Sequence, residues 1–332
     1  MKYVALLSIL LLSLTIEAKE LSIKFGTIAP GGTPWSDSLE EIQARVAKES
    51  NKQIKIKVFL GGQLGGELEI LQKIRRGNIE GGGLTCAAMA SIIPELDLLE
   101  VPFLFDSSEE ADFILDNYLL EPFTKLFSSK GFVMVTWAEN GWRSIGHKTK
   151  FIKKPSDLKG VKIRSQESKV HLAFWQKMQA SPVAIAVPEV LPALQTGVVE
   201  AFDNTPLFTL AAEWHTAIKF YSVTEHIYQP GAIIYSKKFW DKISDADKKI
   251  LMGPGNGQAA IVRSNVRKLG SSLIDVLKET GTSTYTLTPA EKTDFRKASA
   301  GLAEQAIKDI GGDASKIYAL IQEGKKAYKA KK

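Results

Sequence analysis

Cysteine and histidine are scarce in this chain of 332 residues, which has one cysteine, Cys86, and four histidines. A single thiol excludes an internal disulfide framework and any zinc site built from several thiolates. No two histidines are spaced as metal ligands on one helix face, so we expect neither a metal nor a cofactor. Cys86 lies in a small apolar stretch without a neighbouring base, and we expect a buried structural thiol rather than a nucleophile.

The sequence also lacks the local motifs that mark common active sites. Its glycine-rich stretches at 31–33 and 81–83 are not followed by the Gly-Lys-Ser/Thr of a phosphate loop, and neither has dinucleotide-binding spacing. No G-x-S-x-G nucleophile elbow is present. We therefore expect a protein that is not an enzyme, and an exported enzyme without a recognisable motif remains the alternative.

Long apolar runs are absent except at the N-terminus, where residues 4–16 follow Lys2 and precede Ala18. This order is typical of a secretory signal peptide, and the run is shorter than the roughly 20 residues of a membrane span. We expect cleavage after residue 18 and a periplasmic protein that does not itself span a membrane. An uncleaved anchor is the alternative.

The net charge of +6 is distributed unevenly. Basic residues are missing between Arg76 and Lys125, whereas residues 143–164 contain eight of them against Asp157 alone. A lysine-rich stretch at 325–332 is expected to be solvated. Because the remainder is acidic and the protein exported, we expect no nucleic-acid partner. We interpret the basic stretch as a solvated loop rim, with partner docking as the alternative.

Strand-like alternation and helix-like periodicity follow each other along the chain, which predicts α/β units with a parallel sheet. The length favours two domains, and the polar stretch 146–159 is the candidate linker between them. The predicted strands are 21–27, 53–59, 132–137, 160–164, 182–186, 198–202 and 232–235. The predicted helices begin at Pro34 after a Thr33 cap, at Glu67 before a Gly77 stop, near Glu167, at Pro188, at Pro206 and at Pro289 after a Thr288 capping box.

Six short motifs occur in an order that is more specific than any one of them. They are T-I-A-P-G-G-T-P-W at 27–35, G-Q-L-G-G-E at 62–67, N-G-W-R at 140–143, P-S-D-L-K-G-V-K-I-R at 155–164, E-V-L-P-A-L-Q-T-G-V-V-E at 189–200 and K-K-F-W at 237–240. Together they resemble the extracytoplasmic solute-binding proteins of TRAP (tripartite ATP-independent periplasmic) transporters, the DctP-like family.

The resemblance implies a two-lobed, periplasmic-binding-protein-like α/β fold, with each lobe a mixed sheet flanked by helices and a long helix spanning both. Residues 19–140 with 230–270 would form lobe I, and 141–229 with 271–332 would form lobe II, around a ligand cleft. The implied function is capture of a small organic acid by hinge closure and its delivery to integral-membrane permease subunits (DctQ/DctM-like). A sensor or scaffold protein is a further alternative.

The resemblance also implies which residues contact the ligand. Arg164 ends the K-I-R motif, where the family places an arginine that pairs with a substrate carboxylate, and a guanidinium can hold a carboxylate through two parallel hydrogen bonds. Arg143 matches a second family arginine. Asn204 matches a polar ligand partner, although Phe202 and an inserted Thr205 depart from the family pattern. For Arg164, a structural arginine at a lobe surface is the alternative.

Three other candidates have evenly matched alternatives. Glu67 matches an acidic position near the cleft that can bind an amine or hydroxyl, and it can equally be a helix N-terminal acid. Trp35 can line the cleft or belong to the buried stripe that it shares with Leu39. Trp214 stands where the family usually has phenylalanine. These extra aromatic residues, with Phe202, suggest a ligand less polar than a C4-dicarboxylate.

Overall fold

The computed structural model describes residues 20–254, 256–270 and 272–331. The expected signal peptide, residues 1–18, lies outside this part of the chain. The strands are β1 (Leu21–Gly26), β2 (Ile54–Phe59), β3 (Gly81–Thr85), β4 (Phe132–His147), β5 (Lys162–Ser165), β6 (Ser181–Ala184), β7 (Ala201–Asn204), β8 (Phe220–Ser236) and β9 (Ser283–Thr286).

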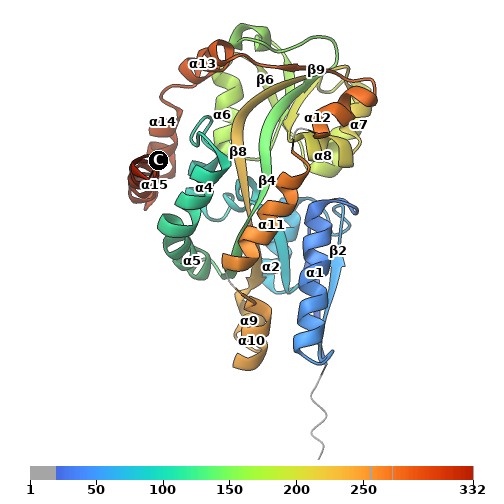
Figure 1. The fold of residues 1–332 in the computed structure, drawn as a ribbon, viewed down its shortest axis with the longest axis vertical. Coiled ribbons are helices and arrows are strands. Elements are labelled where there is room, and N and C mark those ends of the chain that lie inside the picture. The colour runs from blue at the N-terminus through green and yellow to red at the C-terminus, as the bar shows by residue number, and fades with distance from the viewer. Residues whose placement is uncertain (1–19, 255, 271, 332) are drawn as a thin grey trace, which may run out of the picture.

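Helices alternate with the strands over most of the chain (Figure 1). The α-helices are α1 (Pro34–Glu49), α2 (Glu67–Arg76), α3 (Cys86–Met89), α4 (Ser108–Ile114), α5 (Leu120–Ser129), α6 (Lys169–Lys177), α7 (Val187–Thr196), α8 (Pro206–Ala211), α9 (Lys237–Trp240), α10 (Asp245–Met252), α11 (Asn256–Lys268), α12 (Ser272–Glu279), α13 (Pro289–Ala298), α14 (Leu302–Ile310) and α15 (Ala314–Ala330). The segments η1 (Pro94–Glu100), η3 (Pro155–Leu158) and η4 (Trp214–Ala217) are 3₁₀-helices, and η2 (Leu115–Leu119) is a π-helix.

The strands form one mixed sheet in the order β2-β1-β3-β8-β4-β7-β5-β6, and β9 pairs with β8. The N-terminal strands β1, β2 and β3 are parallel to one another, as are β5, β6 and β7 at the other end. Two long antiparallel strands, β4 and β8, join the two ends (Figure 1). The expected mixed sheets of two lobes are thus continuous through β4 and β8.

The candidate linker 146–159 does not connect the two ends of the sheet. It starts at the last residues of β4 and leads through η3 toward β5, which places it beside strands of one end only. The two ends are connected because β8 pairs with β3, β4 pairs with β7, and the two long strands pair with each other.

The expected long helix is present as two consecutive helices, with Leu269 and Gly270 in a turn between them. The first, α11, packs on α1 and β4, and the second, α12, packs on α8 and β9. The pair lies across β4 and β8 (Figure 1) and so reaches both ends of the sheet.

The lysine-rich C-terminus belongs to a docked helix: Lys325 is half-buried, whereas Lys326, Lys329 and Lys331 are exposed, as expected of a solvated stretch. Lys325 Nζ lies 2.7 Å from Glu110 Oε2 and donates to the Leu104 carbonyl oxygen. Ile317 and Ile321 are fully or nearly fully buried on the same helix, α15. An apolar stripe therefore holds this segment against α4 despite its charge.

Candidate functional site

A pocket lies where the C-terminal ends of two sets of parallel strands face each other. Thr27 follows β1 and Thr85 ends β3, while Arg164 and Asn204 lie on β5 and β7 from the other end of the sheet. Loops at the C-terminal ends of parallel strands are the usual ligand position in α/β sheets. The space that protein atoms leave free between the lining residues, part of it open to solvent, is about 430 Å³.

Five of the seven candidate ligand-binding residues line this pocket. The full lining is Thr27, Ile28, Ala29, Trp35, Glu67, Gly83, Leu84, Thr85, Asn140, Arg143, Arg164, Gln166, Val187, Asn204, Phe208 and Gln229. The other two candidates, Phe202 and Trp214, are almost completely buried outside the lining and pack edge to face, with ring centres 5.0 Å apart. They lie behind the lining, where Trp214 contacts both Arg164 and Phe208.

Arg164 is held in place but not neutralised. Its Nε donates to the Ile185 carbonyl oxygen at 2.9 Å, and its guanidinium carbon lies 5.4 Å from the ring centre of Trp214. Within the described residues its two terminal nitrogens have no hydrogen-bond acceptor, and no carboxylate forms an ion pair with it. Burial, followed by the charge of Arg143, lowers the pKa of Arg164 to about 10. The carboxylates of Asp203, Glu167 and Glu67 act in the opposite direction, but none of the three forms an ion pair with Arg164.

Arg143 is neutralised by its own neighbours. Its Nε lies 2.5 Å from Asp203 Oδ2, and its Nη2 donates to the Asp203 carbonyl oxygen. Both side chains are buried. Although burial alone would raise it, the Arg143 guanidinium and the His226 ring, whose Nε2 lies 3.4 Å from Asp203 Oδ2, hold the pKa of Asp203 well below its usual range. Arg143 therefore contributes shape and hydrogen bonds to the pocket more than free charge.

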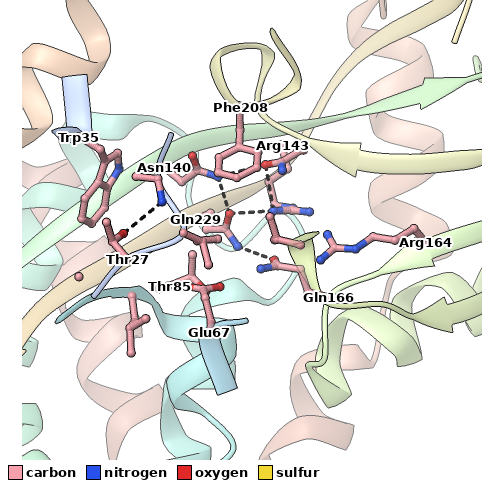
Figure 2. A pocket seen from close by; sticks show the side chains of 16 residues that line it. Thr27, Trp35, Glu67, Thr85, Asn140, Arg143, Arg164, Gln166, Phe208 and Gln229 are labelled. Atoms are coloured by element: carbon pink, nitrogen blue, oxygen red, sulfur yellow. Dashed lines mark hydrogen bonds between the residues drawn. The ribbon is translucent and has the colours of Figure 1, made fainter. Parts of the chain in front are cut away.

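A network of amide side chains connects Arg143 to the rest of the pocket. Gln229 Oε1 accepts from Arg143 Nη1 and Asn140 Nδ2, each at 2.7 Å. Gln229 Nε2 donates to Glu100 Oε2 at 2.9 Å and to Gln166 Oε1 (Figure 2). All four hydrogen-bonding positions of Gln229 are used, which makes it the rigid centre of this wall.

Glu67 and Trp35 both line the pocket, and each is also held by the structural contacts that its alternative describes. Glu67 begins α2, and its two carboxylate oxygens accept from Thr85 N at 2.7 Å and from Thr85 Oγ1 at 2.8 Å. Burial raises the pKa of Glu67 to about 7. The Trp35 indole donates to the Glu139 carbonyl oxygen, and its ring packs in an apolar cluster while also lining the pocket.

Close backbone contact across the pocket indicates a closed conformation. A Cβ added to Gly66, before α2, would lie 3.3 Å from the Cβ of Ala186 at the start of α7. A Cβ on Gly62 would meet Pro188 at the same distance. Glycine in the 62–66 motif thus allows a turn from one end of the sheet to touch a helix from the other.

Sequence reasoning missed Asn140, Gln166 and Gln229. Two of them had a signal in the chain: Asn140 opens the N-G-W-R motif, and Gln166 comes two residues after Arg164. Gln229 lies within β8, where nothing local marks it as part of the site.

The profile described as Bacterial extracellular solute-binding protein, family 7, matches residues 25–309.

This chain belongs to that family.

Among its relatives, a solute-binding protein of Verminephrobacter eiseniae is 29% identical over 69% of this chain and 68% of its own length. The 2,3-diketo-L-gulonate-binding periplasmic protein YiaO of Escherichia coli is 26% identical over 91% of this chain and 92% of its own length. A TRAP periplasmic solute-binding protein from Polaromonas sp. JS666, solved with D-erythronate, superposes with a TM-score of 0.85 at 28% identity, covering 91% of this chain and 98% of that one.

Members of this solute-binding family and its solved neighbours are substrate-binding proteins rather than enzymes. The family is extracytoplasmic. In the part of the chain that the structure describes, every helix is too short or too polar to cross a bilayer.

Proposed function

We propose that this family 7 protein captures a small organic acid in the pocket and passes it, in the periplasm, to an integral-membrane TRAP permease of the DctQ/DctM type. The observation that carries the proposal is the buried, uncompensated guanidinium of Arg164. A buried cation without a counter-ion is costly, and an incoming carboxylate supplies the missing charge through two charge-assisted hydrogen bonds.

The similar proteins support an acid as the solute. The Polaromonas protein is solved with D-erythronate and the E. coli relative is named for 2,3-diketo-L-gulonate, and both solutes carry a carboxylate. Closure of the Gly62–Gly66 turn onto α7 would exclude water from the pocket and strengthen the ion pair. A permease could then distinguish the closed, loaded protein from the open one.

Native mass spectrometry of the protein purified from its host tests the proposal. Wild-type protein should carry an acid that is absent from Arg164→Gln, whereas Arg296→Gln, which changes an exposed arginine, should keep it. Calorimetry with the acid so identified should show a loss of roughly 2–5 kcal/mol of binding in Arg164→Gln, the scale for removing one partner of a buried charge pair. Equal loading of wild type and Arg164→Gln would refute the role of this arginine.

A further inference from the structure

The polar groups along most of the pocket are already occupied by one another. Gln229 is saturated by Asn140, Arg143, Glu100 and Gln166. The oxygen of Asn204 accepts from Asn140 Nδ2 at 3.1 Å and from Thr205 N at 2.9 Å. A solute facing this wall therefore meets few acceptors that are not already in use.

The wall contributed by β1, α1 and β3 is mostly carbon. The Trp35 indole nitrogen is engaged with Glu139, so the ring presents only carbon to the pocket. Ile28, Ala29 and Leu84 are buried apolar residues of the same wall. The two oxygens of Glu67, the one carboxylate in the lining, each accept a hydrogen bond from Thr85.

Unused donors gather at the opposite end of the pocket. Within the described residues, Arg164 Nη1 and Nη2, Gln166 Nε2 and Asn204 Nδ2 have no acceptor, and all of them belong to the β5 and β7 side. Trp35 and Arg164 lie at opposite ends of the pocket, with Phe208 along one side between them (Figure 2). The site is thus polar at one end and apolar at the other.

We infer that the solute is a monocarboxylate with an apolar body, its carboxylate at Arg164 and its carbon skeleton extending toward Trp35 and Phe208. This inference rests on the proposed function and narrows it. A second carboxylate would meet carbon or the Glu67 carboxylate instead of a free cation, since Arg143 is neutralised by Asp203. Beyond the reach of Gln166 Nε2, Asn204 Nδ2 and the Thr27 hydroxyl, a hydroxyl on the solute would face the carbon wall and lose its water without gaining a partner, which is unfavourable in a closed site.

Three acids with the same six-carbon chain separate the possibilities: hexanoate, gluconate and adipate. They differ only in hydroxyl groups or in a second carboxylate, so isothermal titration calorimetry on the full protein compares those features directly. We expect hexanoate to bind at least ten-fold more tightly than either of the others.

A matched pair of variants ties this preference to the pocket wall. Val187 lines the pocket, and Val187→Thr keeps its shape while adding a hydroxyl, so the ratio of hexanoate to gluconate affinity should fall several-fold. Val183 is 37% exposed on β6 outside the lining, and Val183→Thr should leave the ratio unchanged. Circular dichroism melting confirms that both variants fold.

The possible outcomes separate this inference from the proposed function. Binding of gluconate or adipate as tightly as hexanoate would overturn the apolar monocarboxylate while leaving an organic-acid binding protein intact. An unchanged affinity ratio in Val187→Thr would also overturn it. Failure of all three acids to bind would also overturn the apolar monocarboxylate, whereas the proposed function stands or falls on the acid that native mass spectrometry finds on the purified protein.

Discussion

The pocket contains two buried arginines whose surroundings are opposite. Arg143, on β4, has Asp203 against its guanidinium and Gln229 on its remaining side. Arg164, on β5, has one carbonyl oxygen and an aromatic face but no carboxylate. The Arg143 guanidinium thus has a buried counter-ion, whereas the Arg164 guanidinium has no ion-pair partner. The presence or absence of a contacting carboxylate makes this difference.

The largest effect should come from removing the counter-ion of Arg143. Asp203→Asn leaves a buried guanidinium uncompensated and should lower the free energy of unfolding by roughly 3–5 kcal/mol, measured by urea denaturation. Arg164→Gln should leave stability unchanged or raise it, because it removes a buried charge that has no partner. Similar losses of stability in both variants would abolish the distinction between the two arginines.

A smaller, pH-dependent effect is expected at Glu67, whose pKa burial raises from 4.5 to about 7. Between these values the unfolded chain releases the Glu67 proton while the folded protein retains it, so stability falls as pH rises. Above about pH 7 the ionised carboxylate is buried at a cost of up to about 3 kcal/mol. Glu67→Gln removes this dependence and keeps hydrogen bonds to Thr85 within reach.

Urea denaturation at pH 5 and pH 8 measures that difference. Glu67→Gln should gain stability relative to wild type on going to pH 8, whereas Glu69→Gln, which changes an exposed carboxylate on the same helix, should not. A gap between wild type and Glu67→Gln that is the same at both pH values would show that Glu67 titrates normally.

The smallest effect should come from the aromatic support behind Arg164. Trp214→Leu removes the ring face beside the guanidinium and should weaken acid binding by about 0.5–1 kcal/mol. Trp214→Phe keeps a ring there and should recover much of the affinity, as measured by calorimetry. If Trp214→Leu and Trp214→Phe bind the acid equally well, the aromatic ring does not contribute to binding and residue 214 acts only through packing.

Much of the secondary structure was predictable because its signals are local. Thr33 caps its helix and Thr288 forms a capping box, both as expected, and Gly77 and Gly197 end their helices in the left-handed conformation. The glycine-rich strand β3 was missed because its composition is unlike that of a strand. A Cβ on Gly83 would lie only 2.8 Å from the Trp35 ring, so the requirement for glycine there comes from a tertiary contact.

The long strand β8 was predicted only at its end, over 232–235, whereas it covers Phe220–Ser236. Its first half contains polar residues such as Thr224 and Gln229, which do not alternate as in a half-exposed strand. Both are buried, and their polar atoms are satisfied inside the fold: Thr224 Oγ1 forms a hydrogen bond with His226 Nδ1, and the amide network holds Gln229.

By itself, the sequence determined much of the order of helices and strands, the family resemblance and the place of both arginines in their motifs, because each depends on neighbouring residues. Only the tertiary structure decided which arginine is paired with a carboxylate. Asp203 and Gln229 lie 60 and 86 residues from Arg143, and they reach it through the pairing of β4 with β7 and β8. A charge is neutralised by what is near it in space, and folding sets that distance.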